Sequence, residues 1–168
     1  CALLLLVARP HEQPPPSPYC RRGPPLAGVY HSPRLEVKER CAVATGVALD
    51  LLVDPNLDAL LDDVRPRVVF DCVAYGAYPF EIDAARIYET NFNFVSRLLE
   101  RLSTRRIACY VHAGSSSEYG ENASAPKETD RTAPNSEYAV SKVAAANLLY
   151  FWGKRKKLPC CNLRLYSV

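Results

Sequence analysis

The stretch "IACYVHAGSSSEYG", Ile107–Gly120, decides the fold of the surrounding chain. Its first half, Ile107–Ala113, is a short apolar run, which is typical of a strand buried in a sheet. A cluster of polar residues follows at once: Ser115, Ser116, Ser117 and Glu118. In an open α/β sheet, ligands bind beyond the carboxyl ends of the strands, so this cluster is the first candidate for a functional site.

Short apolar runs and long amphipathic runs alternate on both sides of this stretch. The predicted strands are Cys41–Asp50, Arg67–Ala74, Ile107–Ala113 and Cys160–Val168. The predicted helices are Asn56–Val64, Phe80–Leu102 and Ser136–Lys154. Such alternation predicts right-handed βαβ units and a parallel sheet, in which the strands that end at Ala74 and Ala113 lie side by side.

Composition and charge restrict the class of protein. The chain has 168 residues, of which 48% are hydrophobic, enough for one globular domain with a sizeable core. The net charge of +3 is too small to imply a nucleic-acid partner, and we interpret the basic run Lys154–Lys157 as a complement to the dipole of a helix end. No apolar run approaches the roughly 20 residues that span a bilayer, so no membrane partner is expected.

The seven cysteines are scattered along the chain without C-x-x-C pairs or a His/Cys cluster, so no metal site is predicted. Cys72 and Cys109 lie inside apolar runs and are expected to be buried, reduced thiols. This usage predicts a reducing compartment, the cytoplasm.

The N-terminal part differs in composition from the rest. Eight of the 24 residues from Pro10 to Pro33 are prolines, which fix φ and remove hydrogen-bond donors. We therefore interpret residues 1–34 as an irregular segment and residues 35–168 as the globular part. The alternative for the proline-rich segment is a docking site for a partner domain.

Tyr138 and Lys142 are four residues apart on the predicted helix Ser136–Lys154, so they lie on one face. A tyrosine hydroxyl has an ordinary pKa of about 10, but a neighbouring ammonium group favours the phenolate and lowers that pKa. A hydroxyl from Ser116 can hold a substrate oxygen while Tyr138 moves a proton to or from it. The hydride would come from a nicotinamide cofactor, because no side chain supplies one. The pattern thus indicates the interconversion of a carbonyl and an alcohol.

Five segments resemble the extended short-chain dehydrogenases/reductases, in the NAD-dependent epimerase/dehydratase group that acts on nucleotide sugars. They are "LDLLVDPNLDALLDDVRPRVVFDCVA" (49–74), "YETNFNFVSRLLE" (88–100), "AGSSSEYG" (113–120), "YAVSK" (138–142) and "LRLYSV" (163–168). The resemblance implies a Rossmann-like, doubly wound parallel sheet, NAD or NADP as cofactor, and a nucleotide-sugar substrate. It leaves open an epimerase, a dehydratase or a 4-ketoreductase.

The resemblance also implies roles at the reacting centre. Tyr138 would be the general acid/base, and Lys142 would bind the nicotinamide ribose and lower the pKa of Tyr138. Ser116 would hydrogen-bond the sugar hydroxyl or ketone, with Ser115 as the rival candidate. Glu118 lies where dehydratases of this family place a proton-removing base; its alternative is a solvated loop carboxylate.

Further residues are implied at the cofactor. They are Asp50 and Leu51 at the adenine end, Ala74, Tyr75 and Gly76 along the pyrophosphate and ribose, and Ser115 with Tyr138 and Lys142. The two long predicted helices are the candidate surface for a homodimer.

The N-terminal part departs from the family pattern. The family opens with a Gly-x-x-Gly-x-x-Gly turn, whereas Gly23, Gly28 and Gly46 have no such spacing. "CALLLLVARPHE" (1–12) resembles the tail of the first helix, and Val168 falls where the family continues into its substrate lobe. We therefore expect an internal fragment that by itself binds NAD(P) weakly and turns over no sugar. The alternative is a catalytically inactive Rossmann-type module for protein contact.

Overall fold

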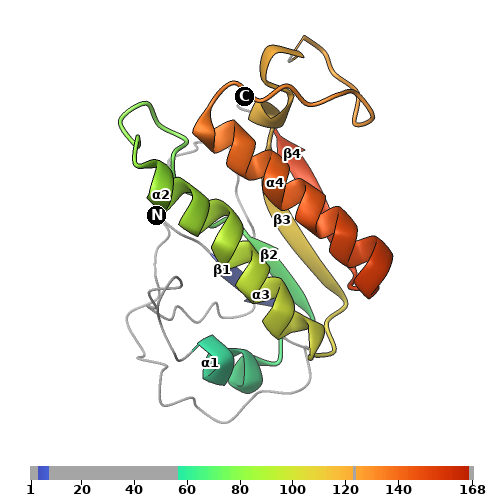
Figure 1. Ribbon diagram of the computed structural model, residues 1–168. Coiled ribbons are helices and arrows are strands. Elements are labelled where there is room, and N and C mark those ends of the chain that lie inside the picture. Colours follow the sequence, from blue (N-terminus) through green and yellow to red (C-terminus); the bar gives the residue numbers. More distant parts are fainter. Residues whose placement is uncertain (1–3, 8–56, 123, 167–168) are drawn as a thin grey trace, which may run out of the picture.

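A computed structural model describes residues 4–7, 57–122 and 124–166 of the chain (Figure 1). Within these residues, the chain forms an α/β fold around a sheet with strand order β1-β2-β3-β4. The strands are β1 (Leu4–Val7), β2 (Val68–Asp71), β3 (Cys109–Ser115) and β4 (Cys160–Leu165). The predicted strand Cys41–Asp50 and the candidate cofactor residues Asp50 and Leu51 lie outside the described residues.

Strands β2, β3 and β4 are parallel, which confirms the predicted sheet. Asp71 of β2 pairs with His112 of β3, so the strands predicted to end at Ala74 and Ala113 are neighbours. Strand β2 ends earlier than predicted, because the Asp71 carboxylate accepts a hydrogen bond from the Val73 N–H at 2.9 Å and turns the chain out of the sheet.

Strand β1 corrects the expectation of a helix tail near the N-terminus. Leu4–Val7 runs antiparallel to β2, with Leu4 opposite Asp71 and Val7 opposite Val68. A short run of leucines has no polar period, so periodicity cannot distinguish a helix end from a strand. Pairing with the free edge of β2 gives its backbone groups hydrogen-bond partners. The sheet is therefore parallel except at this edge.

The long predicted helix between β2 and β3 consists of three continuous segments. They are α2 (Ala84–Tyr88), the π-helical turn η1 (Glu89–Asn93) and α3 (Phe94–Ser103). The helix begins later than the predicted Phe80, because Asp83 caps it by accepting a hydrogen bond from the Arg86 N–H at 3.1 Å. The predicted first turn lies outside it, with Ile82 83% exposed.

The remaining helices include the two other predicted ones and a 3-10 turn that was not predicted. They are α1 (Leu57–Val64), the 3-10 turn η2 (Ser116–Asn122), α4 (Glu137–Phe151) and the π-helical end η3 (Trp152–Lys156). Ser136 caps α4 by accepting a hydrogen bond from the Ala139 N–H at 3.1 Å. This cap places the start of α4, and with it Tyr138, beside the end of β3.

The helices α2, α3 and α4 lie in front of the sheet in the view of Figure 1. The core between helices and sheet is formed by Leu57, Leu61, Val69, Val73, Phe94, Val95, Leu98, Leu99, Leu102, Tyr110, Leu149 and Leu158. On the other face, Phe70, Leu163 and Leu165 are 37%, 46% and 54% exposed. Among the described residues the helices thus cover one face, and no second helical layer of a doubly wound sheet is present in that part of the chain.

Two cysteines correct the expectation of buried thiols. Cys72 is exposed, because β2 has already ended at Asp71 and the chain has left the sheet. Cys109 is half-buried, since it alternates with the buried Tyr110 and so faces the open side of the sheet. No helix of the described residues is long and apolar enough to cross a membrane.

Candidate active site

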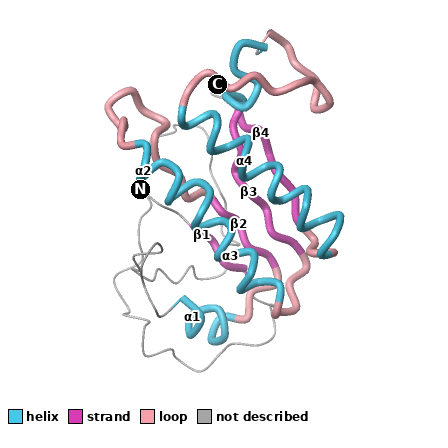
Figure 2. The backbone as a smooth tube through the Cα atoms, viewed as in Figure 1, coloured by secondary structure: helices cyan, strands magenta, loops and turns pink. Residues whose placement is uncertain are grey.

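The loops that follow β2 and β3 lie at the same, upper end of the sheet in Figure 2, together with the start of α4. Ser115 is the last residue of β3, and Tyr138 lies in the first turn of α4 with Lys142 one turn later. The Ser115 side chain hydrogen-bonds Tyr138. The Lys142 ammonium lies 5.8 Å from the centroid of the Tyr138 ring and donates a hydrogen bond to the Ala113 carbonyl at 3.0 Å. The structure thus brings these three candidate residues together.

The electrostatics of Tyr138 differ from the expectation that Lys142 lowers its pKa. Burial raises the pKa of Tyr138 and is the largest influence. The hydrogen bond with Ser115 lowers this pKa, whereas the charges of Glu118 and Glu81 raise it. Burial also lowers the pKa of Lys142, although Asp71 and Glu118 favour its ammonium form. Tyr138 is therefore a neutral phenol at neutral pH.

Ser115 and Ser116 were rival candidates for the substrate oxygen, and the structure separates them. The serine that contacts Tyr138 is Ser115, whose hydroxyl also accepts a hydrogen bond from the Ser117 N–H at 3.1 Å. Ser116 begins the turn η2.

Glu118 is fully buried, so it is not the solvated loop carboxylate of the sequence-based alternative. Its carboxylate accepts hydrogen bonds from the Ser115 N–H at 3.1 Å, Asn162 Nδ2 at 3.1 Å and Arg164 Nε at 2.7 Å. In this placement an ion pair and two amide donors occupy its oxygens. Glu118 is instead part of the framework that surrounds Ser115.

Sequence reasoning missed Asn162 and Arg164. Both lie on β4 and share the helix-covered face of the sheet with Cys160. The signal for them was present: polar residues at every second position of an otherwise apolar strand "CCNLRL" face one side. Their partners, in contrast, are more than forty residues away in sequence and carry no local signal.

The loop after β2 contains the candidate cofactor residues Ala74, Tyr75 and Gly76. Asn91 of η1, fully buried, accepts a hydrogen bond from the Tyr75 N–H at 2.9 Å and donates one to the Tyr75 carbonyl at 2.8 Å. Asn91 also donates to Ser141 Oγ at 2.9 Å. A single amide side chain therefore ties this loop to both long helices.

Gly76 is required by the geometry of the same loop. Its φ is +93°, a region that favours glycine, and a Cβ at this position would lie 2.6 Å from Ile87 Cγ1. Its N–H donates a hydrogen bond to Glu81 Oε2 at 2.8 Å. The backbone of the loop thus packs closely against the start of the helix.

A row of polar side chains crosses the three parallel strands under α4. Asp71, His112 and Asn162 occupy paired positions on β2, β3 and β4. The Asp71 carboxylate accepts a hydrogen bond from the Tyr110 hydroxyl and lies 3.2 Å from His112 Nδ1. His112 is fully buried. Among the described residues, His112 Nε2 and Asn162 Oδ1 are buried without a hydrogen-bond partner.

The comparisons with known proteins agree with this geometry. The curated Protein CapI of Staphylococcus aureus is 28% identical over 116 residues, which cover 67% of this chain and 35% of that protein. The UDP-glucuronic acid 4-epimerase of Bacillus cereus, solved with NAD, is 28% identical with a TM-score of 0.61, and covers 69% of this chain and 36% of its own. The RMD protein of Pseudomonas aeruginosa, solved with NADPH, is 27% identical with a TM-score of 0.59, covering 70% of this chain and 41% of its own.

The chain thus spans little more than a third of the length of these relatives. The family model that describes the NAD-dependent epimerase/dehydratase family matches residues 21–168, most of the chain. The matched range includes the whole constellation around Tyr138 and the loop after β2. The chain therefore belongs to the NAD-dependent epimerase/dehydratase family.

Proposed function

We propose that the protein is an NAD(P)-dependent oxidoreductase that acts on a nucleotide sugar, with Tyr138, Lys142 and Ser115 at the reacting carbon. The observation that carries this proposal is the position of the Lys142 ammonium, 5.8 Å from the centroid of the Tyr138 ring, with Ser115 at the end of the neighbouring parallel strand close enough to lower the pKa of the phenol. A hydroxyl pair of this kind can hold one substrate oxygen from two sides. The names of the relatives, which include 4-epimerases of UDP-sugars, support the substrate class.

The described residues fit a dinucleotide at its nicotinamide end. Gly76 has no side chain, and its left-handed backbone keeps the loop after β2 close to α2. Only backbone atoms of Gly76 therefore line this edge of the loop. Lys142 has two N–H groups beyond the one that bonds Ala113, and an ammonium suits ribose hydroxyls. When bound, the nicotinamide ring supplies or takes up the hydride that no side chain can. Relatives solved with NAD and with NADPH leave both forms as candidates.

The chain's own residues would move the proton. Tyr138 takes the proton of a sugar hydroxyl as the alcohol becomes a ketone, and returns it when the ketone is reduced. Ser115 Oγ hydrogen-bonds the same oxygen and keeps it near the phenol. The raised pKa of Tyr138 suits proton donation at neutral pH. Proton acceptance needs the phenolate, which the Lys142 charge favours.

The position of Glu118 supports an epimerase or a ketoreductase over a dehydratase. A dehydratase must remove a proton from carbon, and this requires a free base near the sugar ring. Glu118 is fully buried and paired with Arg164 at 2.7 Å, so its carboxylate is engaged elsewhere. We therefore propose 4-epimerisation, with ketoreduction as the second candidate.

A catalytically inactive Rossmann-type module is the alternative from another class. The intact group of Tyr138, Lys142 and Ser115 opposes it. A homodimer through the long helices remains a proposal, supported by the exposed Tyr150 and Phe151 of α4.

The test compares Tyr138→Phe with the wild-type protein, expressed with the sequence that flanks it in its gene. Turnover of UDP-sugars would be followed by NMR and NADH binding by fluorescence. We expect Tyr138→Phe to bind NADH normally and to lose turnover by about 10²- to 10⁴-fold, as for a proton-transfer group. Tyr150→Phe is the matched control, because Tyr150 is 68% exposed and distant from the site. Wild-type protein that binds NADH without converting any sugar would favour the inactive module instead.

A further inference from the structure

Strand β4 reaches the reacting pair through a buried carboxylate. We propose that Asn162 and Arg164 are positioning residues, which act through Glu118 to hold Ser115 beside Tyr138. This inference rests on the proposed function, since Ser115 and Tyr138 are the reacting pair there. Neither Asn162 nor Arg164 contacts Tyr138 in the hydrogen bonds described above, so their effect would be indirect.

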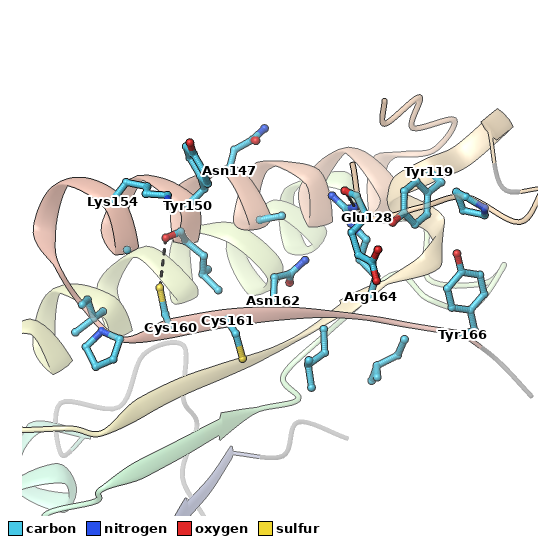
Figure 3. Close-up of a pocket in the computed structure, with 18 residues that line it drawn as sticks. Tyr119, Glu128, Asn147, Tyr150, Lys154, Cys160, Cys161, Asn162, Arg164 and Tyr166 are labelled. Carbon is cyan, nitrogen blue, oxygen red and sulfur yellow. Dashed lines mark hydrogen bonds between the residues drawn. The ribbon is translucent and has the colours of Figure 1, made fainter. Parts of the chain in front are cut away.

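Arg164 joins β4 to two consecutive residues of the turn after β3. Its Nε donates to Glu118 Oε2 at 2.7 Å, and its NH1 group donates to the Tyr119 hydroxyl at 2.8 Å and the Glu128 carbonyl at 3.0 Å. The guanidinium carbon also lies 4.6 Å from the centroid of the Tyr119 ring. Figure 3 shows Arg164 beside Tyr119 and Glu128, at one end of the groove along β4 and α4. The rigid fork of an arginine fixes direction as well as charge.

Asn162 holds the same carboxylate from the neighbouring position on the strand. Its Nδ2 donates to Glu118 Oε1 at 3.1 Å and lies 3.3 Å from Oε2. Glu118 Oε1 in turn accepts the Ser115 N–H at 3.1 Å. The contacts therefore form a continuous path from β4 through Glu118 to the backbone of Ser115, whose hydroxyl meets Tyr138.

Gly114 shows how closely this path is packed. A Cβ on Gly114 would lie 2.5 Å from Glu118 Oε1 and 2.5 Å from Asn162 Oδ1. The Asn162–Glu118 pair therefore crosses directly over the backbone that leads into Ser115. A residue with any side chain at this position would displace the pair, so a glycine before Ser115 is needed for the contact between Asn162 and Glu118.

The same contacts place the Glu118 carboxylate where its charge influences the Tyr138 phenol. The groups that influence Tyr138 are the Ser115 hydroxyl and the carboxylates of Glu118 and Glu81, with the Lys142 ammonium 5.8 Å from the ring. Glu118 raises the pKa of Tyr138, so loss of its charge should lower that pKa. A residue that only supports the fold would have no such directional effect on a phenol several contacts away.

The experiment uses four variants: Arg164→Met, Arg164→Lys, Asn162→Ala and Glu118→Gln. The readouts are kcat and KM for the sugar, hydrogen exchange of the Ser115 amide by NMR, and titration of Tyr138 by ¹³C-tyrosine NMR, assigned with Tyr138→Phe. Arg106→Met is the matched control, because Arg106 is exposed. The last two readouts need no turnover, so they test the inference even if the proposed function fails.

We expect Arg164→Met and Asn162→Ala to lower kcat about tenfold to a hundredfold with KM changed less than about threefold, as for a misplaced reacting group. The Ser115 amide should exchange faster, while core amides of α3 stay protected. Arg164→Lys should recover part of kcat, and Glu118→Gln should lower the pKa of Tyr138. If Arg164→Met does not fold, Arg164→Lys and Glu118→Gln decide the matter. Unchanged exchange at Ser115 and unchanged titration of Tyr138 in the folded variants would overturn the proposal.

Discussion

The two loops at the upper end of the sheet are held in place by different chemistry. The turn after β3 is fixed by an ion pair between the fully buried Glu118 carboxylate and the half-buried Arg164 guanidinium, 2.7 Å apart. The loop after β2 is fixed by the neutral amide of Asn91, which bonds both the N–H and the carbonyl of Tyr75. The Glu118 and Asn91 side chains are both fully buried, and each bridges elements that are distant in sequence. They differ in that the Glu118 carboxylate of the first raises the pKa of Tyr138 more than any other charge does, whereas Glu81 of the loop after β2 makes a smaller contribution.

This difference has a physical consequence for the site. A buried carboxylate raises the pKa of a nearby tyrosine, whereas an amide leaves it unchanged. The proposed chemistry requires control of the proton at Tyr138, and the Glu118 carboxylate influences that proton. The loop after β2, which the family resemblance places at the cofactor, needs only a fixed backbone, and the Asn91 amide fixes it. Both loops are thus fixed by a fully buried side chain, but the two side chains differ in their influence on the pKa of Tyr138.

The largest effect is expected when the ion pair between Glu118 and Arg164 is broken. Arg164→Met leaves Glu118 buried without its cation, and loss of one partner of a buried ion pair costs about 3–5 kcal/mol of the free energy of unfolding. Urea unfolding measured by circular dichroism would give this value, and Arg106→Met should change it by less than about 0.5 kcal/mol. A loss below about 1 kcal/mol would mean that the pair is effectively solvated.

Loss of the Asn91 amide should lower the free energy of unfolding by less than loss of the Arg164 guanidinium does. Asn91→Ala leaves the N–H and the carbonyl of Tyr75 without their side-chain partner, and unsatisfied buried groups cost about 1–3 kcal/mol. The same urea experiment applies. Unlike Arg164→Met, this variant should leave the titration of Tyr138 unchanged. A shifted pKa of Tyr138 in Asn91→Ala would contradict the contrast between the two loops.

A smaller effect is expected at the start of α4, which lies at the same end of the sheet as both loops. Ser136→Ala removes the side chain that caps α4, and loss of an N-cap costs about 1 kcal/mol. Ser136→Asp should keep most of the stability, because an aspartate also caps. Thermal unfolding of the three proteins would show the order wild type, Ser136→Asp, Ser136→Ala; equal stability of Ser136→Ala and wild type would exclude a role for the cap.

The smallest effect concerns alkaline pH. Burial raises the pKa of Tyr138 in the folded state, so its stabilising contribution is complete below the unfolded pKa of about 10 and is lost as pH rises through the folded pKa. Wild type should therefore lose stability relative to Tyr138→Phe only above about pH 10. Urea midpoints of both proteins from pH 7 to pH 11 would measure this. A difference that grows in the opposite direction would show that Tyr138 ionises readily when folded.

The amino-acid sequence by itself determined the alternation of strands and helices and the parallel sheet. It also placed Tyr138 and Lys142 on one helix face, because a spacing of four residues fixes a face in any α-helix. The family followed from short motifs at strand ends. These features depend on neighbours within one element, so local periodicity is sufficient to predict them.

Only the tertiary structure decided which serine meets Tyr138, what Glu118 does, and that Leu4–Val7 is a strand. Ser115 ends β3 and Ser116 begins the turn η2, so the way in which the chain leaves the sheet decides which hydroxyl lies near Tyr138. Glu118 finds Arg164 only because β3 and β4 pair with Ser115 opposite Leu165. A burial, a charge pair or a strand edge depends on residues that are distant in sequence, and the periodicity within one element contains no information about them.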